Sequence, residues 1–450
     1  MTALATVAVV AGGVTACGSI EPVAPDAGAT APDAQPPSPP DAAPGTCDPR
    51  ALVDDDFECG FGLGLRTDVQ WSGSDLRLAP TATSGEFRSR IFDGTDPATS
   101  WSALSWTPRA PYGKALPGNE GFEGDYAEDG IDMDDNVMLL HLDDADLSAG
   151  ATVRDDSGYE NHAVIAGADM TATAGRFGQA VSDSSASYLY VDAAGTTNFD
   201  FGEDDLTWAL WLNTQQDCAA ENQVYMGGEV SGSDGFHMWL GCRSSASQVC
   251  PAGSSGARAG GTFRSLQSVP DGASYCGTSR IDDGAWHHLA VVKDGHADAT
   301  VTLYVDGVAE AQLDASFAAP IDFQDNVDLN VGAFIDGSFQ AEATLDEVAI
   351  WRRPLSAEEI ASLYRRGVRR LEFEVRGCDD AQCQGAPDFP AADALDRNPL
   401  TDPGDALSAG SAIDLGGEIR GRYFQYRAVF RSAVPGDGPI LEEVSVRRAQ

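Results

Sequence analysis

Nine cysteines are the residues whose number and spacing most directly suggest chemistry in this sequence. Cys17 follows an apolar N-terminal stretch, and the other eight are Cys47, Cys59, Cys218, Cys242, Cys250, Cys276, Cys378 and Cys383. An even number of cysteines is typical of disulfides formed in an oxidising compartment. Zinc binding is the alternative, but no Cys-x₂-Cys pair with a matching histidine pair is present. We therefore expect four disulfides.

Proximity along the chain suggests how some of these cysteines pair. Cys47 is expected to bond to Cys59, and Cys378 to Cys383. Four cysteines remain, and they pair among themselves in one of three ways that the sequence does not distinguish: Cys218, Cys242, Cys250 and Cys276.

Glu342 and Asp346 are the pair of carboxylates most similar to that of a glycoside hydrolase. On one face of a strand they lie about 13 Å apart, at about 3.3 Å per residue. Retaining and inverting mechanisms need roughly 5–9.5 Å between the two carboxyl groups. The sequence also lacks a His-Glu-x-x-His zinc motif, a Gly-x-Ser-x-Gly elbow and a glycine-rich phosphate loop. We therefore expect a protein that is not an enzyme.

Two adjacent histidines and a group of aromatic residues are the remaining candidates. His287 and His288 alternate along an expected strand, so they face opposite sides and are expected to have structural roles. Sugar sites combine a stacking aromatic ring with polar partners, often on loops held by a rigid scaffold. The Gly- and Ser-rich region 225–275 offers such rings, for which core packing is the alternative role: Tyr225, Phe236, Trp239 and Tyr275.

The elements that must position these side chains are short strands. Apolar and polar residues alternate in runs bounded by Gly, Asp, Ser and Pro, at 85–92, 206–214, 287–293, 300–306, 345–351, 371–376, 423–431 and 441–447. Evenly spaced short strands predict an all-β protein built from sandwich or jelly-roll domains. One helix is expected over 356–366, with Ser356 as its N-cap.

The N-terminus has the pattern of a sorting signal. Residues 3–16 are small and apolar, too few for a membrane-spanning helix, and Val14-Thr15-Ala16-Cys17 resembles the lipobox of bacterial lipoproteins. No Lys or Arg precedes the apolar run, and an alanine-rich start is the alternative reading. The resemblance implies a signal peptide over 1–17, lipidation of Cys17, and a lipid-anchored protein of the bacterial cell envelope. Gly18 is compatible with sorting to the outer membrane, where the protein would be periplasmic or surface-exposed.

Residues 18–46 are rich in Pro, Ala and Asp, contain no aromatic residue, and predict an extended linker. The whole chain has a net charge of −42. Such a field repels phosphate backbones and anionic lipid headgroups, so we expect no nucleic-acid partner and membrane contact only through the lipid anchor. The charge suits divalent cations or solubility alone.

Seven segments in family order resemble the laminin-G-like jelly roll of the concanavalin A lectin/glucanase superfamily. They are VMLLHLDD, DDSGYENHAVIAG, GRFGQAV, DLTWALWL, DGAWHHLAVVKDG, VTLYVDGVAE and LDEVAIWRRPLSAEEIASLY. The resemblance implies a jelly roll over 132–368. The flanks, 47–131 and 369–450, resemble those of bacterial surface proteins that carry this domain. They are expected to form one smaller β-sandwich into which the jelly roll is inserted, with two separate modules as the alternative.

Many members of this superfamily hold a structural calcium ion, so the resemblance implies a calcium site here. The matching positions are Asp143 or Asp144, Asp156, Asn161 and Asp346. Calcium needs six to eight oxygen ligands of this kind. Asp346 is two and four residues from Val348 and Ile350, so on a regular strand the three side chains point to the same face. This alternation predicts a carboxylate that faces the core. Acceptance of backbone hydrogen bonds is the alternative role of that carboxylate.

Together these features predict a non-catalytic binding or adhesion lipoprotein. We expect its laminin-G-like domain to recognise an extracellular glycan or a surface protein. A structural envelope component without a small ligand is the alternative, and a module of a glycoside hydrolase is a less favoured one.

Overall fold

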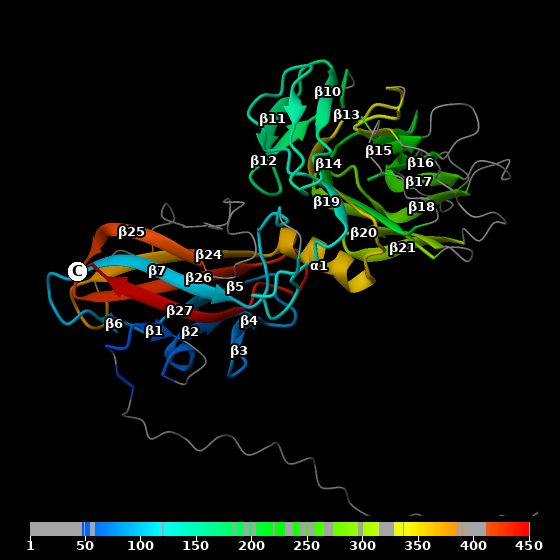
Figure 1. The fold of residues 1–450 in the computed structure, drawn as a ribbon. Coiled ribbons are helices and arrows are strands. Elements are labelled where there is room, and N and C mark those ends of the chain that lie inside the picture. The colour runs from blue at the N-terminus through cyan, green and yellow to red at the C-terminus, as the bar shows by residue number, and fades with distance from the viewer. Residues whose placement is uncertain are drawn as a thin grey trace, which may run out of the picture. The chain divides into compact units, whose positions relative to one another are not determined.

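The computed structural model describes residues 47–449, except 49, 55–58, 119–120, 184–185, 193–197, 200–203, 219–220, 230–236, 244–248, 251–255, 265–272, 296–299, 315–327, 336, 385–388 and 390–410. The elements below all belong to one compact unit, residues 48–450 (Figure 1). Its described regular elements are strands except for one α-helix and one short 3₁₀ helix, so the all-β class predicted from the sequence is confirmed. None of the described helices is long and apolar enough to span a membrane.

The jelly roll consists of two antiparallel sheets, each with eight described strands. Sheet 1 has the order β11-β12-β23-β14-β19-β20-β21, and β8 also pairs with β23. Its strands are β8 (Asn136–Leu140), β11 (Thr171–Ala174), β12 (Gln179–Ser182), β14 (Leu206–Asn213), β19 (Trp286–Asp294), β20 (Thr300–Val305), β21 (Val308–Asp314) and β23 (Thr344–Trp351).

Sheet 2 has the order β18-β17-β16-β15-β22-β13-β10-β9. Its strands are β9 (Thr152–Val153), β10 (Ala163–Gly167), β13 (Ser187–Val191), β15 (Gln223–Glu229), β16 (His237–Arg243), β17 (Arg258–Arg264), β18 (Ala273–Arg280) and β22 (Asp328–Val331). The main core lies between the two sheets, because alternate residues of each strand point inward. Trp208, Leu210 and Leu289 from sheet 1 are buried there with Leu189 and Leu240 from sheet 2.

The flanking sandwich forms from strands that precede and follow the jelly roll in sequence. One sheet contains β1 (Val53–Asp54), β3 (Val69–Trp71), β4 (Leu76–Leu78), β7 (Ser100–Pro108), β25 (Ser411–Arg420) and β27 (Leu441–Arg448). The other contains β2 (Leu65–Thr67), β5 (Ser84–Arg88), β6 (Phe92–Asp93), β24 (Arg370–Cys378) and β26 (Tyr423–Arg431), and the short 3₁₀ helix η1 (Phe61–Leu63) precedes β2. The predicted insertion of one sandwich into another is therefore confirmed.

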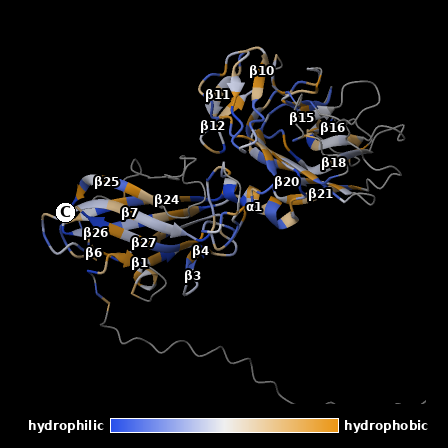
Figure 2. Ribbon diagram, in the orientation of Figure 1, coloured by the Kyte–Doolittle hydropathy of each residue, from blue (hydrophilic) through white to orange (hydrophobic). Residues whose placement is uncertain are grey.

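Aromatic side chains from both flanks share the core of this second sandwich. Trp101 packs 5.0 Å from Phe424, and Trp106 packs 4.5 Å from Phe373, measured between ring centroids. Strands of the two flanks also pair directly, because β7 lies between β25 and β27, and β26 pairs with β5. In Figure 2, hydrophobic and hydrophilic positions are interspersed along these strands, as expected when one face is buried.

The helix α1 (Ala357–Val368) covers the outer face of sheet 1. Ser356 is the N-cap, as predicted, and it forms a capping box with Glu359: Glu359 N donates to Ser356 Oγ at 3.2 Å, and Ser356 N donates to Glu359 Oε2 at 2.8 Å. Ile360 and Leu363 lie on one side of the helix and pack against Trp351 of β23. This packing fixes α1 where the jelly roll ends and β24 begins.

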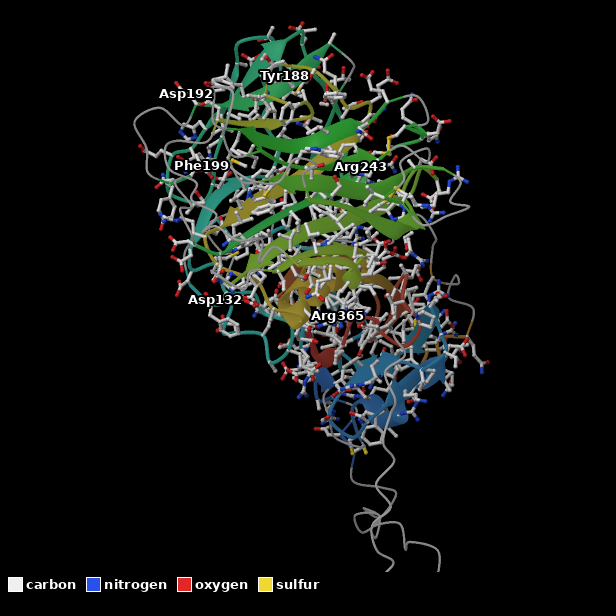
Figure 3. All side chains as sticks on the ribbon, turned by 90° about the vertical axis from the view of Figure 1, so that its right-hand side faces the viewer. Asp132, Tyr188, Asp192, Phe199, Arg243 and Arg365 are labelled. Carbon is white, nitrogen blue, oxygen red and sulfur yellow. A yellow bond between two sulfur atoms is a disulfide. The ribbon has the colours of Figure 1, made fainter. Side chains whose placement is uncertain are left out.

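A buried ion cluster ties α1 to the segment that precedes the jelly roll. Both Arg366 Nη2 contacts to the Glu123 carboxylate measure 3.0 Å, and Lys114 Nζ lies 3.1 Å from Glu123 Oε1. All three side chains are buried. Nearby, Arg365 forms an ion pair with Asp129, and Figure 3 shows Arg365 on α1 at this junction. Buried charges need such partners, so the cluster fixes the end of α1.

Candidate functional site

A hollow of about 420 Å³ lies between the β14–β15 loop and the β22–β23 loop of the jelly roll. We call it the amide pocket, because four side-chain amides contribute to its wall. Its lining residues are Gln216, Asp217, Cys218, Glu221, Asn222, Gln223, Gly337, Phe339, Gln340 and Glu342.

Backbone hydrogen bonds hold the β22–β23 side of the amide pocket. Val224 N donates to Phe339 O at 2.8 Å, and Ala341 N donates to Gly332 O at 2.8 Å. These bonds connect the loop to the start of β15 and to the end of β22. On the other side, the Cys218–Cys242 disulfide joins the β14–β15 loop to β16. Both walls are therefore held by the rigid scaffold of the sandwich.

Phe339 is the aromatic residue of the amide pocket. Its side chain is 41% exposed, and its backbone lies in the left-handed region with φ of 52°. Bulky residues rarely adopt this conformation, and residues held in it tend to cluster at functional sites. Cys218, on the opposite wall, also has a left-handed φ, of 42°. The fold therefore keeps an exposed ring at the rim of the pocket at a cost in backbone energy.

The other side chains of the amide pocket are polar. Gln216, Asn222, Gln223 and Gln340 can each donate and accept hydrogen bonds. Asp217, Glu221 and Glu342 add carboxylate acceptors. A ring face beside such groups is suited to a ligand with an apolar face and hydroxyl groups at its edge.

A second hollow of about 390 Å³ lies elsewhere on the jelly roll. It contains one half-exposed aromatic, Tyr159, but most of its charged side chains form ion pairs, either with one another or with neighbouring residues. Arg352 Nη2 lies 3.2 Å from Asp204 Oδ2, and Lys293 Nζ lies 4.0 Å from Asp205 Oδ1. The carboxylates of this second hollow are therefore better balanced by neighbouring cations than those of the amide pocket.

Three of the aromatic residues predicted for glycan binding are described, and none of the three lines either hollow. Tyr225 and Tyr275 are buried in the core between the two sheets, so core packing, the alternative role, describes both. Trp239 is only 6% exposed and forms a small separate cluster with Val224 and Phe334. Phe236 lies outside the described residues.

Sequence reasoning missed Phe339, because a lone aromatic in the short segment Gly337-Ser338-Phe339-Gln340 forms no strand pattern. Its setting among Gly, Ser and Gln was the signal that could have identified it.

Asp346 does not point into the core, so its predicted parity with Val348 and Ile350 is wrong. The register of β23 shifts against β14: Ala349 pairs with Ala209, but Asp346 pairs with Trp211. This bulge at Glu347, where φ is 50°, inserts one extra residue and reverses the side on which Asp346 lies. Asp346 Oδ2 accepts backbone hydrogen bonds from Arg176 N at 2.6 Å and Phe177 N at 2.9 Å. The alternative role considered for its carboxylate is the one that the structure shows.

The other residues implied as calcium ligands are also engaged by the protein itself. Asp143 Oδ1 accepts from Gln179 N at 2.7 Å, and the Asp144 carboxylate accepts from Arg154 N at 3.3 Å. The Asp156 carboxylate forms an ion pair with the Arg154 side chain.

Asn161 Nδ2 donates to Val137 O at 2.6 Å, and Asn161 Oδ1, the atom that would bind a metal, accepts from Asn198 Nδ2 at 3.1 Å. Within the described part of the chain, no three His, Cys, Asp or Glu side chains are grouped to hold a metal ion. The side chains of the five residues implied as ligands are thus engaged within the protein, and a calcium site stays a prediction.

Asp155, which the sequence reasoning passed over, organises the loop after β9. Its carboxylate accepts hydrogen bonds from Leu139 N, Ser157 N and Asn161 N at 2.8, 3.0 and 2.8 Å. An Asp followed two residues later by Ser is typical of such a turn. The Asp-Asp-Ser-Gly segment is thus explained by hydrogen bonding within the loop.

The two adjacent histidines have separate environments, as their alternation predicts. His287 Nδ1 lies 2.8 Å from Asp306 Oδ2, and its Nε2 lies 3.1 Å from Asp283 Oδ1. Burial lowers the pKa of His287, but these two carboxylates reverse the effect and the net pKa is raised. His288 is buried against Trp211, and burial lowers the pKa of His288 to about 4. Neither histidine lines the amide pocket.

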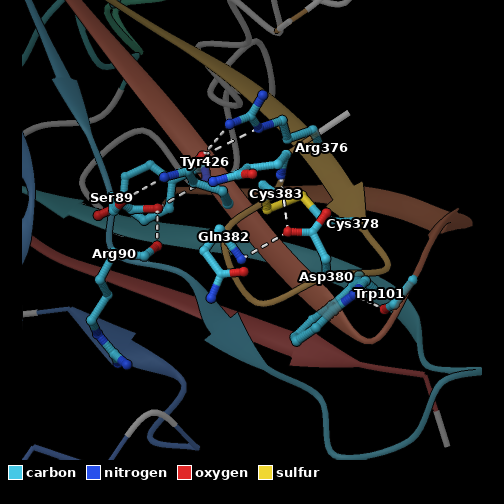
Figure 4. Close-up of a disulfide and its surroundings, with 12 residues drawn as sticks. Ser89, Arg90, Trp101, Arg376, Cys378, Asp380, Gln382, Cys383 and Tyr426 are labelled. Atoms are coloured by element: carbon cyan, nitrogen blue, oxygen red, sulfur yellow. Dashed lines mark hydrogen bonds between the residues drawn. A yellow bond between two sulfur atoms is a disulfide. The ribbon is translucent and has the colours of Figure 1, made fainter. Parts of the chain in front are cut away.

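The cysteines form disulfides, and the structure chooses one pairing where the sequence left three. Cys218 bonds to Cys242, and Cys250 bonds to Cys276. Cys378 bonds to Cys383 across a short loop after β24, where Gln382 N donates to Asp380 Oδ1 at 2.9 Å (Figure 4). Cys47 and Cys59 are also disulfide-bonded, and Cys17 lies outside the described residues.

A comparison with solved structures found several that are similar to about half of this chain. Domain 4 of AbnA, a GH43 extracellular arabinanase from Geobacillus stearothermophilus in complex with arabinotriose, is 17% identical with a TM-score of 0.36, and the match covers 51% of this chain and 98% of that one. The binding domain of Paraclostridial Mosquitocidal Protein 1 is 12% identical with a TM-score of 0.39, over 54% of this chain and 58% of that one. A Trypanosoma rangeli sialidase in complex with 2,3-difluorosialic acid is 15% identical with a TM-score of 0.36. The match covers 51% of this chain and 32% of the sialidase chain.

No curated protein sequence matches this chain. The family model of the concanavalin A-like lectin/glucanases superfamily matches residues 183–361, which run from the start of β13 into α1. This match covers β13 to β23, which include strands of both sheets, and the loops that form the amide pocket. The jelly roll is thus the part of the chain that is similar to the concanavalin A-like lectin/glucanases superfamily.

Proposed function

We propose that this protein is a non-catalytic carbohydrate-binding protein whose jelly roll holds its ligand in the amide pocket. The observation that carries the proposal is the exposed ring of Phe339, fixed in a left-handed conformation beside four side-chain amides. The apolar face of a pyranose ring packs on such an aromatic face, while its hydroxyl groups exchange hydrogen bonds with the amides. The volume of about 420 Å³ lies within the roughly 300–1,000 Å³ usual for ligand pockets.

Hydrolysis is less well supported than binding. Glu342 lines the amide pocket, but Asp346 is buried and its carboxylate accepts backbone hydrogen bonds on β23. The two carboxylates therefore do not face a shared ligand as a catalytic pair does.

We further propose that the protein acts at the bacterial cell envelope, tethered by a lipid on Cys17. The lipobox-like segment, the Pro-rich linker at 18–46 and the disulfides support this location. A linker of that composition would hold the binding module away from the membrane.

A glycan array, probed with the protein and with two single variants, tests the proposal. The protein should bind a defined class of sugar, and Phe339→Ala should lose at least tenfold in affinity because the stacking surface is removed. Phe122→Ala is the matched control, since Phe122 is also an exposed phenylalanine but lies outside both hollows. Each binding experiment is run with calcium and again with EDTA, which also tests the calcium expectation.

Absence of binding to every glycan, or equal binding by both variants, would contradict a carbohydrate site at Phe339. The structural envelope component would then be the better account of the protein.

A further inference from the structure

We propose that the amide pocket selects sugars that carry a positively charged amino group, such as unacetylated hexosamines, over neutral and anionic sugars. This selectivity rests on the proposed function, because it concerns the same pocket. It adds a charge preference that the shape of the pocket does not specify.

The charge of the lining carries the argument. Asp217, Glu221 and Glu342 contribute three carboxylates, and none of the lining residues is Lys or Arg. Within the described residues, the side chains of Glu221 and Glu342 have no ion-pair or hydrogen-bond partner. The pocket therefore has uncompensated negative charge at the place where a ligand would sit.

The second hollow shows that this imbalance is not a general feature of the surface. Its aspartates face arginines: Asp204 pairs with Arg352, and Arg353 also contributes to the wall. Two hollows on one domain thus differ in charge balance, and the hollow with the exposed phenylalanine lacks cations.

The net charge of −42 adds a long-range component. At physiological salt, exposed charges more than about 8 Å away are largely screened. The distant acidic residues therefore attract a cationic ligand mainly at low salt, while Glu221 and Glu342 discriminate at contact. An anionic sugar meets repulsion at both ranges.

An unacetylated hexosamine matches each part of the pocket. Its ring face can stack on Phe339, and a cation close to an aromatic face gains further attraction. Its hydroxyl groups can form hydrogen bonds with the side-chain amides of Gln216, Gln223 and Gln340. Its ammonium group is the positively charged partner that Glu221 and Glu342 lack within the described protein. The N-acetylated sugar has the same ring but no charge, which makes it the natural comparison.

Calorimetric titration with three tetrasaccharides tests this selectivity: β-1,4-linked glucosamine, its fully N-acetylated form, and galacturonate. At low salt the glucosamine tetramer should bind at least tenfold more tightly than the N-acetylated tetramer, and galacturonate should not bind. Raising the salt to about 0.5 M should narrow the difference, since screening weakens exposed charge pairs.

The double variant Glu221→Gln/Glu342→Gln should abolish the preference while it still binds the N-acetylated tetramer. Glu418→Gln/Glu443→Gln is the matched control, because it removes the same charge from exposed residues of the flanking sandwich. A preference that persists in the first variant, or disappears equally in both, would overturn the inference, since the attraction would then be non-specific.

The outcomes also separate this inference from the proposed function. Binding that depends on Phe339 but does not favour the amine, or that favours galacturonate, contradicts the selectivity and leaves the carbohydrate site intact. Failure of all three tetramers and of the glycan array contradicts both.

Discussion

The carboxylate of Asp346 accepts a hydrogen bond at 2.9 Å from the backbone nitrogen of Phe177, 169 residues earlier in the chain. A second hydrogen bond, from Arg176 N, reaches the same oxygen. Together they close the turn between β11 and β12 against β23. The remaining oxygen, Oδ1, is buried without a hydrogen-bond partner among the described residues.

Asp346→Asn should raise the stability of the protein at neutral pH. Burial, reinforced by the charge of Glu347, raises the pKa of Asp346 well above its ordinary value. The folded state thus holds the proton more tightly, so Asp346 contributes stability below about pH 4 and loses it as pH rises through the folded pKa. Asparagine accepts the same two backbone bonds and stays neutral. Thermal unfolding from pH 4 to 9 should show a flatter profile for the variant.

Asp346→Ala is the comparison, because it leaves two backbone donors unpaired and should cost about 1–3 kcal/mol at every pH. If Asp346→Asn is as destabilising as Asp346→Ala throughout, the buried carboxyl is not the origin of the pH dependence.

His288 should make the protein less stable in acid. Burial lowers the pKa of His288 to about 4, against about 6.5 in the unfolded chain. Its neutral form therefore contributes stability that is complete above about pH 6.5 and is lost as pH falls toward 4, on the order of 3 kcal/mol. His288→Gln should flatten the stability profile in this window, measured by urea unfolding at several pH values.

His287→Gln provides a control of opposite sign. The net pKa of His287 is raised, so its contribution is present below about pH 6.5 and is lost as pH rises through the folded pKa. Identical pH profiles for the two variants would contradict both assignments.

Breaking the buried pair of Arg366 and Glu123 should be strongly destabilising. Arg366→Met leaves Glu123 with Lys114 as its remaining cation, and removal of one partner from a buried pair typically costs about 3–5 kcal/mol. Arg431→Met breaks the more exposed pair with Glu372 and should cost about 1 kcal/mol or less. Urea unfolding measures the free energy of unfolding of both variants. A similar decrease in the two would show that burial does not decide how much each ion pair contributes to stability.

The Cys218–Cys242 disulfide should matter for binding as well as for stability. Replacing either described jelly-roll disulfide by two serines should cost about 2–4 kcal/mol, since the bonds span 24 and 26 residues. Only Cys218 lines the amide pocket, so Cys218→Ser/Cys242→Ser should also weaken glycan binding. Cys250→Ser/Cys276→Ser is the matched control and should keep the affinity. Equal affinity losses would show that the pocket does not depend on its own disulfide.

Several elements could be predicted from the sequence because their causes are local. The helix after β23 follows from Ser356 and Glu359, which satisfy each other's backbone groups within a single turn. The short strands follow from alternation of apolar and polar residues, and the disulfides follow from an even cysteine count. The jelly roll follows from seven segments in family order.

The sequence by itself thus determined the all-β class and the presence of disulfides, because composition and short-range pattern specify them. The insertion of one sandwich into the other is expected from the resemblance of the flanks, with two separate modules as the alternative, and the strand pairing decided between them. Only the tertiary structure decided which side Asp346 faces and which aromatic residue is exposed. A bulge at Glu347 depends on pairing with β14, a strand more than 130 residues away in the chain, and strand alternation alone does not reveal it. Phe339 becomes a binding candidate only because folding buries Tyr225 and Tyr275 in the core and leaves its ring at the rim of the amide pocket.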